Sequence, residues 1–425
     1  MRERMRIDTL AACPRNHGPG HSEDRPDRFH DGGRLLLAMG TLFMAALALS
    51  GTFVNVYIWK AEHSYIDIGL FNLVTFGALP LAFLCSGFLA SRLGEVWILR
   101  AGVASLAIFF TILFLLGERG VNHVLWLGAF FGIGQGLYWF AFHVLTFDLT
   151  STDNRGRFNG LGGLFGSLVG MTGPYVAGYL IVHARRLSGY HVIFALSLLL
   201  FGVLLALSFR LRHRGGQHAL RLREGFRFRA DPDWRRLWIG TVVFGLREGV
   251  FSFFIGLLVF FVARDEEDLG QYGLWTGLIS LGAFFLAGRV VRNALVSMRL
   301  MGAAAFLMGA AALVLLLPVK RWTLLLFGGA TAFALPFFVV PFGTMIMNEI
   351  DESAASARHR AEHLISRELA LGVGRIGSVL IFLGVARHLG SPSSFVGMIV
   401  CLAFAHTIAY MLIYKVTFKR RQAAG

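Results

Sequence analysis

Residues 66–91 read IDIGLFNLVTFGALPLAFLCSGFLAS, a run of 26 residues in which Asp67 is the one charged side chain. About 20 predominantly apolar residues are enough for an α-helix to cross the hydrocarbon core of a bilayer. Because no water is available there for an exposed backbone, the crossing segments of a membrane protein are helices or closed barrels. This run therefore predicts a transmembrane helix.

Similar apolar runs recur along the whole chain. Of the 425 residues, 56% are hydrophobic and 15% are charged, whereas soluble proteins carry about 25% charged residues. The sequence therefore excludes the soluble classes and predicts an all-α integral membrane protein with twelve transmembrane helices. We expect these spans near residues 34–58, 66–91, 97–117, 124–148, 160–182, 189–209, 237–262, 272–291, 299–318, 323–347, 366–387 and 393–416.

The basic residues between the spans predict the orientation of the chain. If the N-terminus is cytoplasmic, the even-numbered connections and both tails hold 30 of the 40 lysines and arginines, and the outer loops hold 8. Lysine and arginine accumulate in the cytoplasmic loops of membrane proteins. We therefore expect both termini in the cytoplasm and the protein in the cytoplasmic membrane. The same rule explains the net charge of +15 without a nucleic-acid partner.

Two pairs of similar short segments indicate that the chain consists of two related halves. Phe88-Leu89-Ala90-Ser91-Arg92 at the end of the second span is matched by Phe285-Leu286-Ala287-Gly288-Arg289 at the end of the eighth. Arg157 with Leu161-Gly162 in the fifth span is matched by Arg367 with Leu371-Gly372 in the eleventh. Because transporters are commonly built from repeats, we expect two pseudo-symmetric six-helix bundles. The expected segments are a disordered cytoplasmic tail (1–33), the first bundle (34–209), a basic cytoplasmic linker (210–236), the second bundle (237–416) and a cytoplasmic C-terminal tail (417–425).

Three of the ionisable side chains inside the expected spans stand out because they lie deep in the bilayer. Arg247 and Glu248 stand about ten residues into the seventh span, which at about 1.5 Å per residue is the middle of the bilayer. Arg375 reaches a similar depth in the eleventh span, so Glu248 and Arg375 are expected to meet. A charge at that depth costs about 2.5–3.5 kcal/mol on the insertion scale and marks a functional site. Either Glu248 exchanges a proton or binds a cation while Arg247 or Arg375 binds an anion, or a fixed ion pair holds the two spans together.

The fourth span carries a second group of polar and aromatic candidates: Gln135, Tyr138, Trp139 and His143. Positions 135, 139 and 142 or 143 share one face of a helix. On that face, Trp139 would stack on an apolar or cationic ligand, and His143 would titrate near neutral pH. For His143, a hydrogen bond to a neighbouring helix is an equal alternative.

The connection after the second span carries the most specific motif. The segment Gly87-Phe88-Leu89-Ala90-Ser91-Arg92-Leu93-Gly94-Glu95 resembles the Gly, x, Leu, Ala, Asp, Arg, x, Gly, Arg signature of the major facilitator superfamily. Ser91 and Glu95 stand where the family has its acid and its second base. The resemblance covers all twelve spans, residues 34–418, and implies that fold. It also implies that Gly87, Arg92 and Gly94 belong to a loop that holds the halves in one state.

Two further stretches carry the same resemblance. Gly132-Ile133-Gly134-Gln135-Gly136 resembles a family motif ending in Gln-Gly, with Gly132 in place of an arginine associated with proton coupling. This departure speaks against proton antiport by the usual route. The fifth span resembles the antiporter signature of glycines around Gly-Pro, which favours export, through Gly166, Gly170, Gly173, Pro174 and Gly178. Small residues and proline also let helices pack closely and bend.

Four short segments are similar to a little-characterised bacterial branch of transporter-like proteins of the YqgE type. They are Gly136-Leu137-Tyr138-Trp139, Phe147-Asp148, Arg367-Glu368 and Gly374-Arg375. This resemblance implies no particular substrate for the chain.

These observations favour a secondary transporter that moves a small solute through the lipid bilayer by alternating access, with export favoured and coupling to protons or sodium left open. The sequence contains no GxxxxGK[ST] phosphate loop, so ATP-driven pumping is not expected. One alternative is a membrane-embedded enzyme using the acidic and histidine residues of 348–368, which a solvated connection explains more simply. Another is a receptor or scaffold on a transporter fold. We expect a monomer without enzymatic activity or cofactor. We also expect no bound metal, because Cys13, Cys85 and Cys401 lack any metal-binding spacing.

Overall fold

The structure is a computed structural model. It describes residues 31–150, 152–184, 188–211, 220–229, 231–263, 265–290, 294–353, 359–389 and 392–424. Most of the expected N-terminal tail, and residues 212–219 and 230 of the expected linker, lie outside the described residues.

Twelve helical segments in the described part of the chain are long and apolar enough to cross a membrane, which confirms the predicted fold class. In the first half they are α1 (Asp31–Glu62), α2 (Tyr65–Leu93), α3 (Glu95–Leu116), α5 (Val124–Leu149), α6 (Thr152–His183) and α7 (Ser188–Ser208). In the second half they are α8 (Pro232–Ala263), α9 (Glu266–Val290), α10 (Ala294–Ala312), α11 (Arg321–Ser353), α12 (Arg360–His388) and the pair α13 (Pro392–Ala403) and α14 (Ala405–Ala424). Three short elements connect them: α4 (Glu118–Val121), η1 (Leu222–Phe226) and η2 (Leu313–Leu316).

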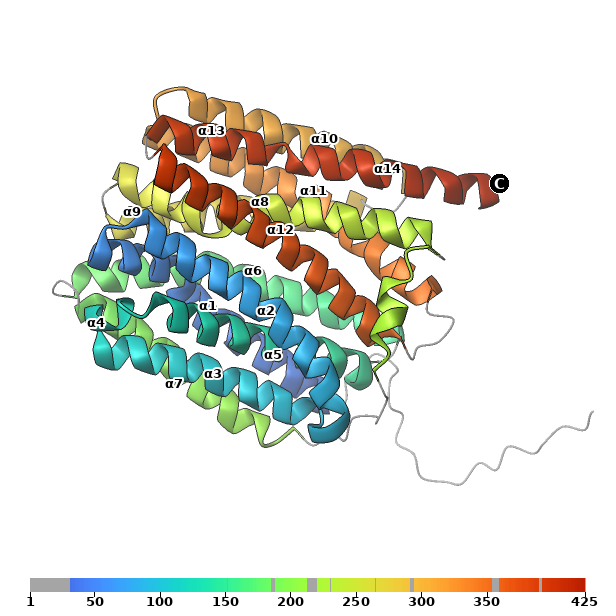
Figure 1. The fold of residues 1–425 in the computed structure, drawn as a ribbon, viewed down its shortest axis with the longest axis horizontal. Coiled ribbons are helices and arrows are strands. Elements are labelled where there is room, and N and C mark those ends of the chain that lie inside the picture. The colour runs from blue at the N-terminus through green and yellow to red at the C-terminus, as the bar shows by residue number, and fades with distance from the viewer. Residues whose placement is uncertain are drawn as a thin grey trace, which may run out of the picture.

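The helices form two bundles that lie side by side (Figure 1). The two most extensive contacts between the bundles are those of α2 with α12 and of α6 with α9. In span numbers these are the second with the eleventh and the fifth with the eighth. When each span is replaced by its counterpart in the other half, six positions away, one pair becomes the other, as expected for pseudo-symmetric halves.

Glycines bring α8 and α12 into close contact. A Cβ atom added at Gly245 would lie 3.1 Å from Cα of Gly374, and one added at Gly249 would lie 2.8 Å from Cα of Arg375. Small residues allow this approach of two backbones inside a membrane. The contact fixes Arg375 beside the turn of α8 that carries Glu248.

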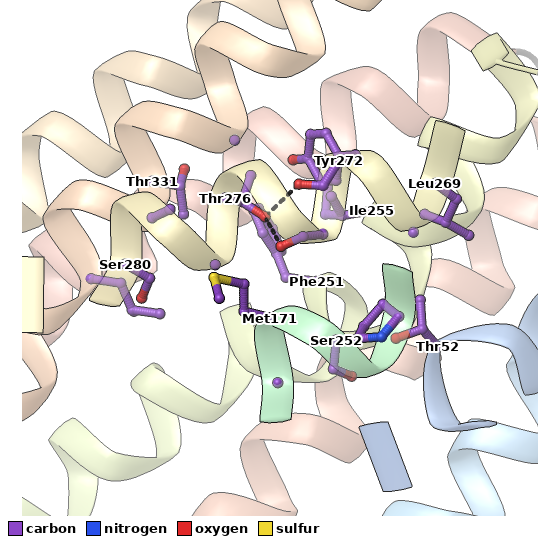
Figure 2. A pocket seen from close by; sticks show the side chains of 18 of the residues that line it. Thr52, Met171, Phe251, Ser252, Ile255, Leu269, Tyr272, Thr276, Ser280 and Thr331 are labelled. Carbon is purple, nitrogen blue, oxygen red and sulfur yellow. Dashed lines mark hydrogen bonds between the residues drawn. The ribbon is translucent and has the colours of Figure 1, made fainter. Parts of the chain in front are cut away.

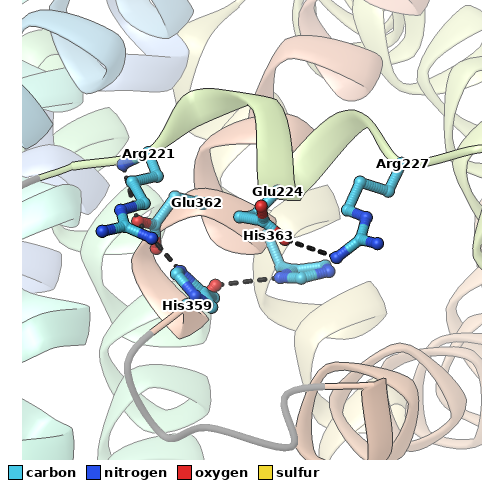
Figure 3. A network of polar contacts seen from close by, with 6 residues as sticks. All are labelled: Arg221, Glu224, Arg227, His359, Glu362 and His363. Carbon is cyan, nitrogen blue, oxygen red and sulfur yellow. Dashed lines mark hydrogen bonds and ion pairs between the residues drawn. The ribbon is translucent and has the colours of Figure 1, made fainter.

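The segment before α12 differs from the solvated connection that the sequence suggested. Glu362 and His363 are buried at the start of α12, because η1 of the linker covers them. The backbone N–H of Arg221 donates to Oε1 of Glu362 (2.9 Å), and Nδ1 of His363 lies 2.9 Å from the carbonyl oxygen of His359 (Figure 3). Trp234 Nε1 donates to the carbonyl of Gly225 at 3.0 Å. The bonds of Glu362 and Trp234 attach the linker to the second half.

Candidate functional site

A cavity of about 520 Å³ lies between the two halves. Its wall comes from both, with Thr52 on α1 and Met171 on α6 facing residues of α8, α9 and α11 (Figure 2). Cavities that hold small molecules typically measure about 300–1,000 Å³. The size and the position between two bundles are those of a small-molecule site.

Arg247 is the least satisfied polar side chain of this cavity wall. It is 4% exposed, and its Nε and Nη2 atoms have no hydrogen-bond partner among the described residues. Its guanidinium carbon lies 4.3 Å from the ring centroid of Phe251, one turn further along α8. A cation over an aromatic face gains about 0.5–2 kcal/mol, but the ring offers no acceptor. In the described part of the chain, Arg247 therefore forms no ion pair or side-chain hydrogen bond, and Glu248 beside it is the nearest carboxylate of the cavity wall.

Glu248, the neighbour of Arg247, has a partner on the other side of α8. Nη2 of Arg375 on α12 donates to Oε2 of Glu248 at 2.8 Å. Nη1 of the same guanidinium lies 3.5 Å from Oε1 of Glu368. The carboxylate of Glu248 lines the cavity, and its side chain is 36% exposed against 18% for Arg375. The structure thus brings Glu248 and Arg375 together and leaves Arg247 apart from the pair.

Hydroxyl groups complete the polar part of the wall, and sequence reasoning missed them. Tyr272, Thr276 and Ser280 follow one another along α9 (Figure 2), at a spacing of four residues that keeps them on one helical face. That spacing is the signal that could have revealed them. Thr276 donates to the carbonyl of Tyr272 at 2.8 Å, whereas Oγ1 of Thr331 on α11 is buried without a recorded partner.

The candidates of the fourth span, which forms α5, do not line this cavity. Tyr138 is fully buried inside the first half, where it stacks on Phe43 with ring centroids 3.5 Å apart. Trp139 stacks on His143 at 5.7 Å and lines a separate cavity of about 190 Å³ between α1, α5 and α6. Gln135 is half-buried and is outside the lining of the 520 Å³ cavity.

The candidates of the fifth span, which forms α6, divide into two groups. Gly170 and Pro174 line the large cavity. Gly173 packs on α1, where an added Cβ would lie 2.6 Å from Cβ of Ala48, and Gly178 packs on the backbone of Glu266 at the start of α9. The glycines therefore serve close helix contacts beside the cavity.

The loop after α2 lies away from the cavity. Gly94 has φ = +80°, a conformation that favours glycine, and it joins α2 to α3. Arg92 is exposed, and Gly87 is buried against Ile365 of α12 and Leu220 of the linker. At Gly87 this motif therefore touches the second half.

Glu266 joins the two halves at the end of the bundle where α1 ends and α9 begins, which we call the α1/α9 end. Its carboxylate forms an ion pair with Nζ of Lys60 on α1 and accepts a hydrogen bond from the Tyr190 hydroxyl on α7 at 2.7 Å. Glu266 is 6% exposed. These contacts link the two halves at the α1/α9 end.

Twelve apolar helices in two bundles around a cavity define a multi-pass membrane transporter rather than an enzyme. The family model of the Major Facilitator Superfamily matches residues 35–362, and the chain belongs to that family. It is 35% identical over 388 residues to the uncharacterized protein YqgE of Bacillus subtilis (strain 168), covering 91% of this chain and 90% of YqgE. A protein in the sodM 3' region of Geobacillus stearothermophilus is 42% identical over 160 residues, covering 38% of this chain and 75% of that protein.

Solved structures share the fold. A bacterial homologue of the iron transporter ferroportin, in an outward-facing state with soaked iron, superimposes with a TM-score of 0.66 at 15% identity, covering 90% of this chain and 98% of that one. The same homologue in its outward-facing state gives a TM-score of 0.65 at 16% identity, covering 91% and 99%. Likeness at this identity shows the fold alone.

Proposed function

We propose that the protein is a secondary active transporter that carries a small solute through the 520 Å³ cavity by rocking one half against the other. The observation that carries this proposal is the wall itself, since both halves contribute residues to one cavity that holds Arg247 and Glu248. Alternating access in such folds is a rigid movement of repeats around a fixed site near the middle of the membrane. A solute bound here would face either side in turn.

We further propose that this structure represents the inward-facing state. Supporting this, α6 and α9 touch near the α1/α9 end, where a Cβ added at Gly273 would lie 3.2 Å from Pro174. Further along, Gly163 on α6 and Gly288 on α9 have nothing within 4 Å of an added Cβ. We take this as an opening on the α6/α9 side toward the other end of the bundle, while α2 still meets α12 there at Gly87 and Ile365. With cytoplasmic termini, as the basic residues predict, that other end is the cytoplasmic one.

The cellular arrangement is part of the same proposal. We place the protein in the cytoplasmic membrane, with bundles at 34–209 and 237–416, a basic cytoplasmic linker at 210–236, and cytoplasmic tails at 1–33 and 417–425. The docking of η1 on α12 supports a linker that moves with the second half. The antiporter-like glycines of α6 support export as the direction.

Proton coupling is proposed at Glu248. Its carboxylate faces the cavity and holds Arg375, so protonation would weaken its attraction to Arg375. Because Gly249 and Gly374 bring α8 and α12 close together, a change at this pair acts directly on the contact between the two helices. The iron named for the ferroportin homologue is not carried over to this chain, because that likeness extends to the fold alone.

The test is solute-dependent proton movement by purified protein in liposomes, followed with a pH-sensitive dye over a panel of small solutes. Wild type is compared with Glu248→Gln, which keeps the size of the side chain and removes its charge. We expect solute-dependent proton flux in wild type and its loss in the variant. Solute movement that is unchanged in Glu248→Gln would reject the proton role, and absence of movement for every solute would count against transport.

A further inference from the structure

The unpaired charge of Arg247 points to the chemical class of the solute. Building on the transport cavity proposed above, we infer that this cavity binds an organic anion, an apolar or aromatic body that carries one anionic group, and that Arg247 binds the anionic group.

The first support is that Arg247 forms no hydrogen bond or ion pair with the described residues. Among the residues lining the cavity, Glu248 is the one carboxylate, and it is already bound by Arg375. Nε and Nη2 of Arg247 have no hydrogen-bond partner in the described part of the chain. A buried cation without a paired anion costs free energy. An anion in the cavity would offset that cost, so the site is complete only with an anionic occupant.

The second support is that Arg375 already binds both carboxylates beside the cavity, Glu248 and Glu368. Arg375 lies between two carboxylates, Glu248 at 2.8 Å and Glu368 at 3.5 Å. A cationic solute would have to compete with Arg375 for Glu248 and would also meet the positive charge of Arg247. The two carboxylates and the two arginines of this cluster balance in charge, so the preference for an anion is local, at the guanidinium of Arg247 that forms no ion pair in the described part of the chain.

The third support is the rest of the wall, which suits the body of such a solute. Phe251, Phe327 and Leu335 provide apolar surface, and Oγ1 of Thr331 is buried with no partner recorded. Its hydroxyl can donate to an oxygen of the anionic group, because a serine or threonine hydroxyl is both donor and acceptor. The cavity thus combines the guanidinium of Arg247, several hydroxyl groups and aromatic faces.

The direct test compares molecules that share a phenyl ring and differ in charge. Equilibrium dialysis of the purified full chain in detergent would measure binding of benzenesulfonate, benzenesulfonamide and phenyltrimethylammonium, after subtraction of binding to empty micelles. Methanesulfonate and naphthalenesulfonate extend the series in apolar size. We expect saturable binding of the sulfonates that strengthens with apolar size, with the amide and the ammonium compound at least tenfold weaker. This comparison needs no variant, so it holds even if substitutions disturb folding.

Variants then test whether Arg247 is the binding group. Arg247→Gln should weaken sulfonate binding at least tenfold, and Arg247→Lys should keep the preference for anions. Arg289→Gln is the matched control: Arg289 also lies over a phenylalanine, 4.1 Å from the ring centroid of Phe285, but it is exposed and lies outside the cavity lining. The control should bind as wild type does.

Several results would overturn the inference. These are equal binding of the three phenyl compounds, absence of binding by every sulfonate, unchanged binding in Arg247→Gln, or binding of anionic phospholipid headgroups in place of soluble sulfonates. The transport proposal fails separately. If Arg247-dependent sulfonate binding occurs but no solute crosses a liposome membrane, transport is rejected and the inference stands. If solutes cross without any preference for anions, the inference is rejected and the transport proposal stands.

Discussion

Arg375 on α12 donates a hydrogen bond of 2.8 Å to Glu248 on α8, so that one contact links the two helices that meet along Gly245, Gly249 and Gly374. The bond lies at the wall of the cavity and next to the unpaired Arg247. It therefore connects helix packing in the second half with the charge balance of the proposed site.

Removing Arg375 should lower the stability of the fold more than removing the charge of Glu248. Arg375→Met leaves Glu248 and Glu368 without their cation and should lower stability by roughly 3–5 kcal/mol, the range for breaking a buried pair. Glu248→Gln should cost about 1 kcal/mol or less, because Glu248 is the more exposed partner and Arg375 keeps Glu368. Thermal unfolding midpoints of the purified variants would measure this order. Equal midpoints for the two variants would contradict it.

Glu266 should act as a gate at the α1/α9 end. Glu266→Ala removes its bonds to Lys60 and Tyr190 and should shift the protein toward opening at that end. Thr52→Cys, in a background without the native cysteines, would report this as several-fold faster labelling by an impermeant maleimide added outside right-side-out vesicles. Asp268→Ala is the control, because Asp268 pairs with Arg321 inside the second half. Equal acceleration in both variants would reject the gate.

Thr331 should respond differently from Thr276. Thr331→Val removes a buried hydroxyl without a recorded partner, so stability should be unchanged or rise by about 1 kcal/mol. Thr276→Val removes a hydroxyl that donates to the carbonyl of Tyr272 and should be neutral or slightly destabilising. The comparison is made on unfolding midpoints in solute-free detergent. A clear loss of stability in Thr331→Val would show that its hydroxyl has a partner.

The linker should detach when its bond to α12 is removed. Glu362 is 2% exposed and accepts from the backbone of Arg221. Glu362→Ala should therefore speed trypsin cleavage at Arg221 and Arg223 several-fold. Glu224→Ala is the control, since Glu224 bonds to Arg227 within the linker, at the surface. Cleavage as slow as in wild type would mean that η1 is held by apolar contacts instead.

The sequence was sufficient for the helices because length and hydropathy alone decide whether a segment crosses a bilayer. The twelve spans agree with the structure to within a few residues at most ends. The break at Phe404 between α13 and α14 was missed, since the apolar run continues through it. Counting residues from the cytoplasmic end of each helix also placed Glu248 and Arg375 at the same depth in the bilayer, because both helices rise by about 1.5 Å per residue from the same side.

Counting residues along a helix gives the depth of a side chain but not whether that side chain faces the cavity. Tyr138 lies near the middle of α5, yet it stacks on Phe43 inside the first half. The burial of Glu362 depends on a linker that returns to cover it, a contact far apart in the sequence. The hydroxyl face of α9 is visible as a spacing of four, but its role depends on α6, α8 and α11 standing opposite. These relationships come from helix packing rather than from local pattern.

The most direct test of rocking between the two halves is a pair of distances measured by electron paramagnetic resonance with spin labels in liposomes. One label pair, at His63 and Gln271, spans the α1/α9 end, and the other, at Gly160 and Gly288, spans the opposite end of α6 and α9. We predict that Glu266→Ala lengthens the first distance and shortens the second. Unchanged distances at both ends, or changes of the same sign, would contradict alternating access around this cavity.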